Sequence, residues 1–112
     1  MIQITTHVLD TAKGRPAAGV PIILRKSSGK EWDTIANGIT NQDGRVQDFI
    51  SKDTLLTSGM YRMLFDTKTY FESQKVNVFY PYVMVVFEVE EGEKYHIPLL
   101  LSPFGYSTYR GS

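Results

Sequence analysis

The chain has 112 residues, and its 12 basic and 12 acidic side chains give a formal net charge of zero. This length fits a single domain covering residues 1–112, and the balanced charge argues against a nucleic-acid partner, which usually needs a basic excess. Cysteine is absent, which excludes disulfides and thiolate catalysis, and no run approaches the roughly 20 apolar residues that span a bilayer.

Short stretches of alternating apolar and polar residues, separated by turn residues, predict an all-β protein. About eight strands are expected, and in chain order they cover residues 2–9, 20–24, 32–40, 45–46, 59–66, 83–89, 95–101 and 106–109. We expect one short helix over residues 67–76 and a hairpin in which the acidic turn 90–93 joins its two flanking strands. This pattern indicates an antiparallel β-sandwich.

Aromatic residues crowd the carboxy-terminal third of the chain. They include Tyr80, Tyr82, Phe87, Phe104, Tyr106 and Tyr109. A small sandwich core cannot easily bury all of them, so they either complete the core or form an interface between subunits.

The only two histidines, His7 and His96, lie in strand-like stretches on the face opposite the apolar core residues. Each one alone could be an ordinary polar surface residue. Together with Arg45, which follows an Asp-Gly turn, they would form a site for a small anionic or amide-rich substrate. A catalytic zinc is the competing use of two histidines, but it needs a third ligand, and no His-x-His or His-Glu-x-x-His spacing occurs, so we assign no metal.

Two segments resemble the signature sequences of the transthyretin-related family. One is residues 7–17, HVLDTAKGRPA, and the other is residues 95–107, YHIPLLLSPFGYS. The chain also ends in residues 109–112, YRGS, which is similar to the ending that marks the 5-hydroxyisourate hydrolases of this family rather than its hormone carriers. The resemblance therefore covers nearly the whole chain.

The resemblance implies a transthyretin-like Greek-key β-sandwich with one short helix. It implies a hydrolase of purine (urate) catabolism that converts 5-hydroxyisourate to 2-oxo-4-hydroxy-4-carboxy-5-ureidoimidazoline with histidine-activated water and no cofactor. It also implies a homotetramer, a dimer of dimers, with sites at the dimer–dimer interface. A non-enzymatic carrier of a small ligand is the alternative. Because no secretory leader is recognisable, we expect a cytoplasmic location, or a periplasmic one if a leader has been removed.

The resemblance further implies roles for individual residues. The implied catalytic residues are His7, Arg45, His96 and Ser112. The implied substrate-binding residues are His7, Arg45, Tyr109, Arg110 and Gly111. His96 is a candidate general base, His7 would orient the substrate or the attacking water, and Arg45 would stabilise the developing oxyanion. Which histidine is the base stays open, and the two can titrate as a coupled pair.

Overall fold

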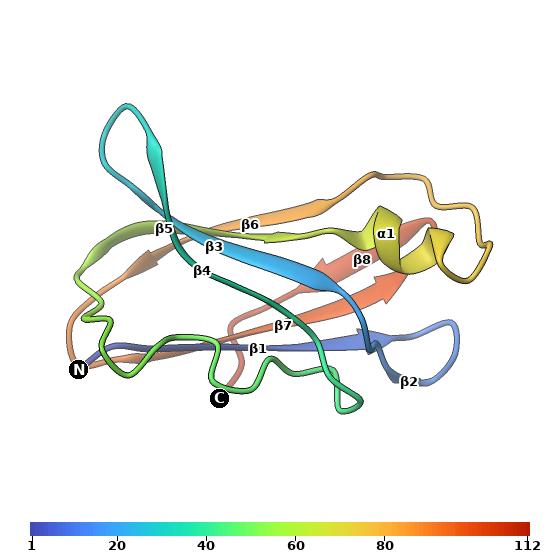
Figure 1. Cartoon of the computed structure of the whole chain (residues 1–112), viewed down its shortest axis with the longest axis horizontal. Coiled ribbons are helices and arrows are strands. Elements are labelled where there is room, and N and C mark those ends of the chain that lie inside the picture. The colour runs from blue at the N-terminus through green and yellow to red at the C-terminus, as the bar shows by residue number, and fades with distance from the viewer.

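Alternating buried and exposed side chains along the strands build a two-layer sandwich, seen in a computed structural model that describes all 112 residues (Figure 1). The strands are β1 (Gln3–Asp10), β2 (Arg15–Pro16), β3 (Pro21–Ser27), β4 (Trp32–Ile39), β5 (Gly59–Phe65), β6 (Val83–Val89), β7 (Lys94–Ser102) and β8 (Gly105–Thr108). One sheet has the order β2-β1-β7-β8, and the other has the order β4-β3-β5-β6. The all-β sandwich predicted from the sequence is confirmed.

The inner faces of the two sheets share one core of 20 buried apolar residues. Ile4 and Val8 of β1 enter this core from one sheet, and Ile22 and Leu24 of β3 enter it from the other. Side chains of the opposite parity therefore point away from the sandwich. This alternation leaves the outer face of the β2-β1-β7-β8 sheet free to carry polar groups.

Strands β1 and β7 run parallel, and every other strand pair is antiparallel. The expectation of an antiparallel sandwich is wrong at this one pair. A parallel pair needs a long connection between its strands, and here the chain passes through the whole second sheet between β1 and β7. The register places Thr5 opposite His96 and His7 opposite Pro98.

The prediction of a strand at residues 45–46 is wrong. These residues are irregular, because Asn41 Oδ1 accepts the amide hydrogens of Asp43 and Arg45 and so closes a turn in place of a strand ladder. The eighth strand is instead the short β2, whose residues Arg15 and Pro16 pair with the end of β1. The predicted number of strands is therefore right although one strand was misplaced.

The hairpin predicted around residues 90–93 is also wrong. Strand β6 pairs with β5 in one sheet, whereas β7 lies between β1 and β8 in the other. The acidic segment crosses from one layer of the sandwich to the other. Local turn residues cannot distinguish these two outcomes, because both need a reversal of the chain.

The single helix, α1 (Thr67–Glu72), is shorter than the predicted span 67–76. It begins after Asp66, whose carboxylate accepts the Thr69 amide hydrogen over 3.1 Å. Beyond the helix the chain forms turns, and Lys75 adopts a left-handed φ of 58°, which ends any helical continuation. No helix of this chain has the length and apolar character needed to cross a bilayer.

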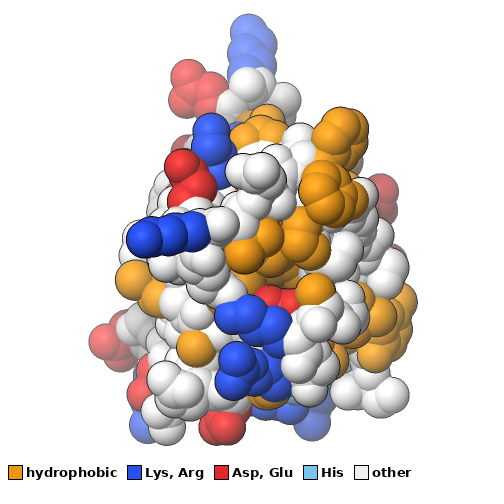
Figure 2. All heavy atoms as spheres, turned by 90° about the vertical axis from the view of Figure 1, so that its right-hand side faces the viewer, with side chains coloured by type: hydrophobic (Ala, Val, Ile, Leu, Met, Phe, Trp, Pro, Cys, Tyr) orange, Lys and Arg blue, Asp and Glu red, His pale blue; other side chains and the backbone are white.

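The aromatic residues of the carboxy-terminal third divide between the core and the surface. Tyr80 and Phe87 pack partly buried against the core. Four others form what we call the aromatic end patch, with exposed fractions of Phe79 80%, Tyr82 45%, Phe104 74% and Tyr106 50%. Their segments are in contact, because the Phe79 amide donates to the Pro103 carbonyl over 2.8 Å. Figure 2 shows hydrophobic side chains gathered at this end of the molecule.

A buried carboxylate joins α1 to the first sheet. Asp10, which is 1% exposed, accepts the amide hydrogens of Ala12 and Lys13 and the hydroxyl hydrogen of Tyr70 over 2.6 Å. Burial, reinforced by the hydrogen bond to Asp10, raises the pKa of Tyr70 to about 12, so this hydroxyl stays protonated. The contact fixes the end of β1 and the helix relative to each other.

Replacing Tyr70 with phenylalanine should destabilise the fold, because one acceptor site of the buried Asp10 carboxylate loses its partner. We expect Tyr70→Phe to lower the free energy of unfolding by about 1–3 kcal/mol in a urea titration. The control is Tyr109→Phe, which removes a hydroxyl from a side chain that is 58% exposed and should leave stability unchanged. Equal stability of Tyr70→Phe and the wild type would contradict this account.

Candidate active site

Two adjacent strands place the predicted histidines on the outer face of the β2-β1-β7-β8 sheet. Thr5 of β1 lies opposite His96 of β7, and His7 lies two residues further along β1. Neighbouring residues of the opposite parity are buried in the core. The orientation predicted for both histidines is therefore confirmed by the burial pattern.

The turn that ends at Gly44 holds Arg45 beside this face. Gly44 has a φ of 75°, and a Cβ built there would lie 2.3 Å from the Val8 carbonyl oxygen, so only glycine fits. The Val8 amide donates to the Gly44 carbonyl over 2.8 Å. The same turn lies against the His7 ring, whose Cδ2 would be 3.3 Å from the added Cβ. Arg45 is thus positioned by backbone contacts to β1.

The carboxy-terminal tail lies against His96 and brings Ser112 to the same place. The Gly111 amide donates to the His96 carbonyl over 2.8 Å in an isolated antiparallel bridge. A Cβ at Gly111 would lie 2.6 Å from Cδ2 of the His96 ring, so a residue without a side chain is required for this approach. Arg110 donates to the Lys94 carbonyl over 3.0 Å and fastens the tail at a second point.

These elements line an open polar cavity of about 310 Å³. Its lining residues are Gln3, Thr5, Arg45, Lys94, His96 and Ser112. None of them is acidic and none is apolar, so the cavity offers positive charge and hydrogen-bonding groups. It suits a small polar molecule that is anionic or becomes anionic during a reaction. No three His, Cys, Asp or Glu side chains of this chain are grouped where they could hold a metal ion.

The structure brings some of the predicted site residues together and separates others. Arg45, His96 and Ser112 line the cavity, and Gly111 contacts the His96 ring. His7 does not line the cavity, but it is close enough for its charge to act on His96.

The other two predicted binding residues, Tyr109 and Arg110, line a separate cavity of about 290 Å³ whose lining is mainly apolar. The Arg110 guanidinium lies 4.5 Å from the centre of the Tyr95 ring, a cation–π geometry. Within this chain both residues therefore lie outside the polar cavity. The contacts of Arg110 with the Lys94 carbonyl and the Tyr95 ring anchor the tail.

Sequence reasoning missed three residues that line the polar cavity, namely Gln3, Thr5 and Lys94. The signal was present in the alternation of the strands. Gln3 and Thr5 share the parity of His7, and Lys94 shares the parity of His96. They were missed because these residue types, unlike histidine, do not by themselves indicate catalysis.

The electrostatic surroundings favour a neutral His96 ring. Burial, followed by the positive charges of Arg45 and His7, holds the pKa of His96 below its ordinary value of 6.5. A neutral imidazole at physiological pH can accept a proton, as a general base must. The ring also forms a hydrogen bond of 2.8 Å between Nδ1 and Thr5 Oγ1.

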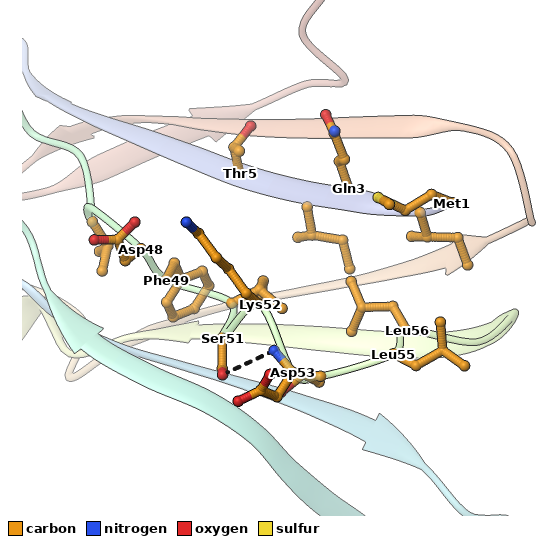
Figure 3. Close-up of a pocket in the computed structure, with 15 residues that line it drawn as sticks. Met1, Gln3, Thr5, Asp48, Phe49, Ser51, Lys52, Asp53, Leu55 and Leu56 are labelled. Carbon is orange, nitrogen blue, oxygen red and sulfur yellow. Dashed lines mark hydrogen bonds between the residues drawn. The ribbon is translucent and has the colours of Figure 1, made fainter.

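A larger cavity of about 480 Å³ lies between β1 and the loop that includes Phe49 and Leu56 (Figure 3). Eight of its 15 lining residues are hydrophobic, and no histidine or arginine is among them. Gln3 and Thr5 of β1 line this cavity as well as the polar one, so the two cavities are neighbours (Figure 3). We place the candidate active site in the smaller cavity, because chemistry requires convergent polar groups rather than volume.

Comparison with known proteins settles the family. The model of the HIUase/Transthyretin family matches residues 4–111. This chain belongs to that family. A probable 5-hydroxyisourate hydrolase of Caenorhabditis elegans is 46% identical over 111 residues, which cover 98% of this chain and 82% of that protein. The 5-hydroxyisourate hydrolase of Mus musculus is 43% identical over 112 residues, covering 97% of this chain and 94% of that protein.

Solved structures agree with this assignment. The 5-hydroxyisourate hydrolase of Klebsiella pneumoniae matches with a TM-score of 0.85 and 33% identity, covering 97% of this chain and 98% of that one. Sea bream transthyretin in complex with thyroxine matches with a TM-score of 0.89 and 34% identity, covering 96% of this chain and 93% of that one. The transthyretin-like fold is therefore confirmed, and backbone similarity does not separate the two activities.

The charge of Arg45 should be measurable through the titration of His96. Because a nearby positive charge disfavours the imidazolium, Arg45→Gln should raise the pKa of His96 toward its ordinary value. The measurement is an NMR titration of the histidine ring signals. Arg25→Gln is the matched control, since Arg25 belongs to β3 in the other sheet. A pKa of His96 that moves equally in both variants would show that Arg45 does not act on the ring.

Proposed function

We propose that this protein is a 5-hydroxyisourate hydrolase. The observation that carries the proposal is the polar cavity in which Arg45 and Ser112 meet a His96 ring whose pKa is lowered. Relatives named as 5-hydroxyisourate hydrolases, which align over nearly the whole chain, support the same activity. The reaction opens a strained cyclic amide with water, and a general base with an oxyanion-stabilising cation meets its requirements.

A non-enzymatic carrier is the alternative on this scaffold, since a thyroxine-bound transthyretin has the same fold. A carrier site for an aromatic ligand would be lined mainly by apolar side chains. The cavity proposed here has no apolar lining residue. Its chemistry favours a small polar substrate and a proton transfer over the binding of an aromatic hormone.

In the proposed reaction, a water molecule adds to a ring carbonyl carbon of the substrate while His96 takes one proton from that water. Negative charge develops on the carbonyl oxygen, and the Arg45 guanidinium stabilises it. The ring carbon–nitrogen bond then breaks, and the protonated His96 returns the proton to the departing nitrogen. The product carries a new carboxylic acid, which releases its proton to solvent.

The remaining charges of the site assist the same chemistry. Lys94 adds a second positive charge to the cavity wall and favours the carboxylate that the reaction creates. His7 lies against Gly44, the residue before Arg45, and would orient the substrate or the attacking water. Ser112 lines the cavity and would contact the substrate. The assignment of the base to His96 follows from its place in the cavity wall, which His7 does not share.

The direct test follows the ultraviolet decay of freshly generated 5-hydroxyisourate with and without the protein. We expect the wild type to accelerate the decay and His96→Asn to lower kcat by about 100-fold or more, because the general base is lost. Arg45→Gln should lower kcat about 100-fold through loss of oxyanion stabilisation. Arg25→Gln should retain wild-type turnover, and all variants should keep the wild-type unfolding temperature. A decay no faster than the spontaneous rate would overturn the proposed function.

We also propose that the active assembly is a homotetramer, a dimer of dimers, with the cavities at the interface between dimers. The aromatic end patch supports this proposal, because exposed aromatic side chains grouped on one surface are typical of subunit contacts. Strands β6 and β8 support it as well, since each forms an open edge of its sheet. The cavity lies on the outer face of a sheet, where a second subunit could close it.

Light scattering after gel filtration tests this assembly, and we expect four times the mass of one chain. Phe79→Asp should lower the mass, because it places a charge in the aromatic end patch at a side chain that is 80% exposed. Leu55→Asp is the control, since Leu55 is 83% exposed and lies on the loop between β4 and β5. A wild-type protein that elutes as a single chain would contradict the tetramer.

A further inference from the structure

We propose that Thr5 is the positioning residue of the general base, holding the His96 ring by Nδ1 so that Nε2 faces the substrate. This inference rests on the proposed hydrolysis and adds to it a residue with no role so far. Thr5 Oγ1 and His96 Nδ1 are 2.8 Å apart, although the two residues are separated by 91 positions in the chain. Both residues line the polar cavity.

The parallel register explains why this contact exists. Thr5 and His96 are register partners on neighbouring strands, so their side chains leave the sheet together on its outer face. The contact is therefore fixed by the backbone ladder between β1 and β7. A slip of one residue would turn Thr5 into the core and break it.

Three threonine hydroxyls from β1 and the turn after it bond to β7, and that of Thr5 has a different kind of partner from the other two. Thr6 donates to the Ile97 carbonyl over 2.6 Å, and Thr11 donates to the Leu101 carbonyl over 3.0 Å. Those bonds satisfy backbone carbonyls and hold the strands together. Among these three threonines, only Thr5 contacts a titratable ring. Its hydroxyl is therefore placed to influence the orientation and protonation of His96.

The ring of His96 is held from two sides. Thr5 occupies Nδ1, and Gly111 packs against the edge that carries Cδ2. Nε2, at the far end of the ring, is the nitrogen that remains for the attacking water. A neutral imidazole has one proton, so Nε2 is a base only when Nδ1 carries that proton and donates it to Thr5 Oγ1.

The hydroxyl also suits both protonation states of the ring. When Nε2 accepts a proton, both ring nitrogens carry hydrogen, and Thr5 Oγ1 continues to accept from Nδ1. Arg45, His7 and Lys94 are the charged or titratable groups around the ring, and the cationic Arg45 and Lys94 have no acceptor for this hydrogen. Thr5 is thus the neighbour that favours the imidazolium, in opposition to the surrounding positive charges.

The test replaces Thr5 with valine, which keeps the β-branched shape and removes the hydroxyl. Thr5→Val should lower kcat by about 10- to 100-fold with a smaller change in KM, because a misplaced base loses its alignment. The acidic limb of the pH–rate profile should move to lower pH, since the imidazolium loses an acceptor. Thr5→Ser, which keeps the hydroxyl, should restore both kcat and the position of the acidic limb. Thr11→Val is the matched control, because it removes a hydroxyl that bonds to β7 outside the cavity.

Nitrogen-15 NMR of the histidine rings gives a readout that does not depend on turnover. In the wild type we expect the Nδ1-protonated tautomer of His96, and in Thr5→Val a shift toward the Nε2-protonated tautomer. Wild-type kcat in Thr5→Val, an unchanged tautomer, or failure of Thr5→Ser to rescue would each overturn the role of Thr5. A wild type without turnover would overturn the proposed hydrolysis and the catalytic part of this role, while the tautomer would still report on the hydrogen bond.

Discussion

The parallel ladder between β1 and β7 is the constraint on which the candidate site depends. It runs through eight residue pairs, from Gln3 opposite Lys94 to Asp10 opposite Leu101. The buried Thr6 hydroxyl reinforces it by donating to the Ile97 carbonyl. Because strand side chains alternate, the same register that packs the core also sets which polar groups meet outside it. Core packing and site geometry are therefore fixed by one set of hydrogen bonds.

The site combines two electrostatic demands that oppose each other. The positive charge of Arg45 suits a developing oxyanion, yet burial and then the same charge lower the pKa of His96 and weaken it as a base. A weak base is still useful near neutral pH, because it is unprotonated before the reaction begins. The proposed hydrogen bond from His96 to Thr5 offsets part of this weakening without adding a negative charge that would cancel the effect of Arg45.

The sequence predicted the outward direction of both histidines because alternation along a strand is a local property. It also predicted the turn before Arg45, where Gly44 must take a positive φ. It failed at residues 45–46 and at the hairpin around 90–93, because those outcomes depend on which distant strand provides the hydrogen-bonding partner. Thr5 and Lys94 were missed for a related reason. Each is unremarkable alone and becomes part of a site only through the β1–β7 register.

One backbone scaffold accommodates both a thyroxine-bound transthyretin and a hydrolase, so the activity must come from the outer face and the groups brought to it. The carboxy-terminal tail shows how one residue can decide which groups reach this face. Gly111 gives its amide hydrogen to the His96 carbonyl and lets the chain pass against the ring, which a side chain would prevent. Only then does Ser112 reach the cavity. The identity of a small residue near the chain end is therefore as important for the proposed chemistry as that of the base, because it decides whether the cavity wall is complete.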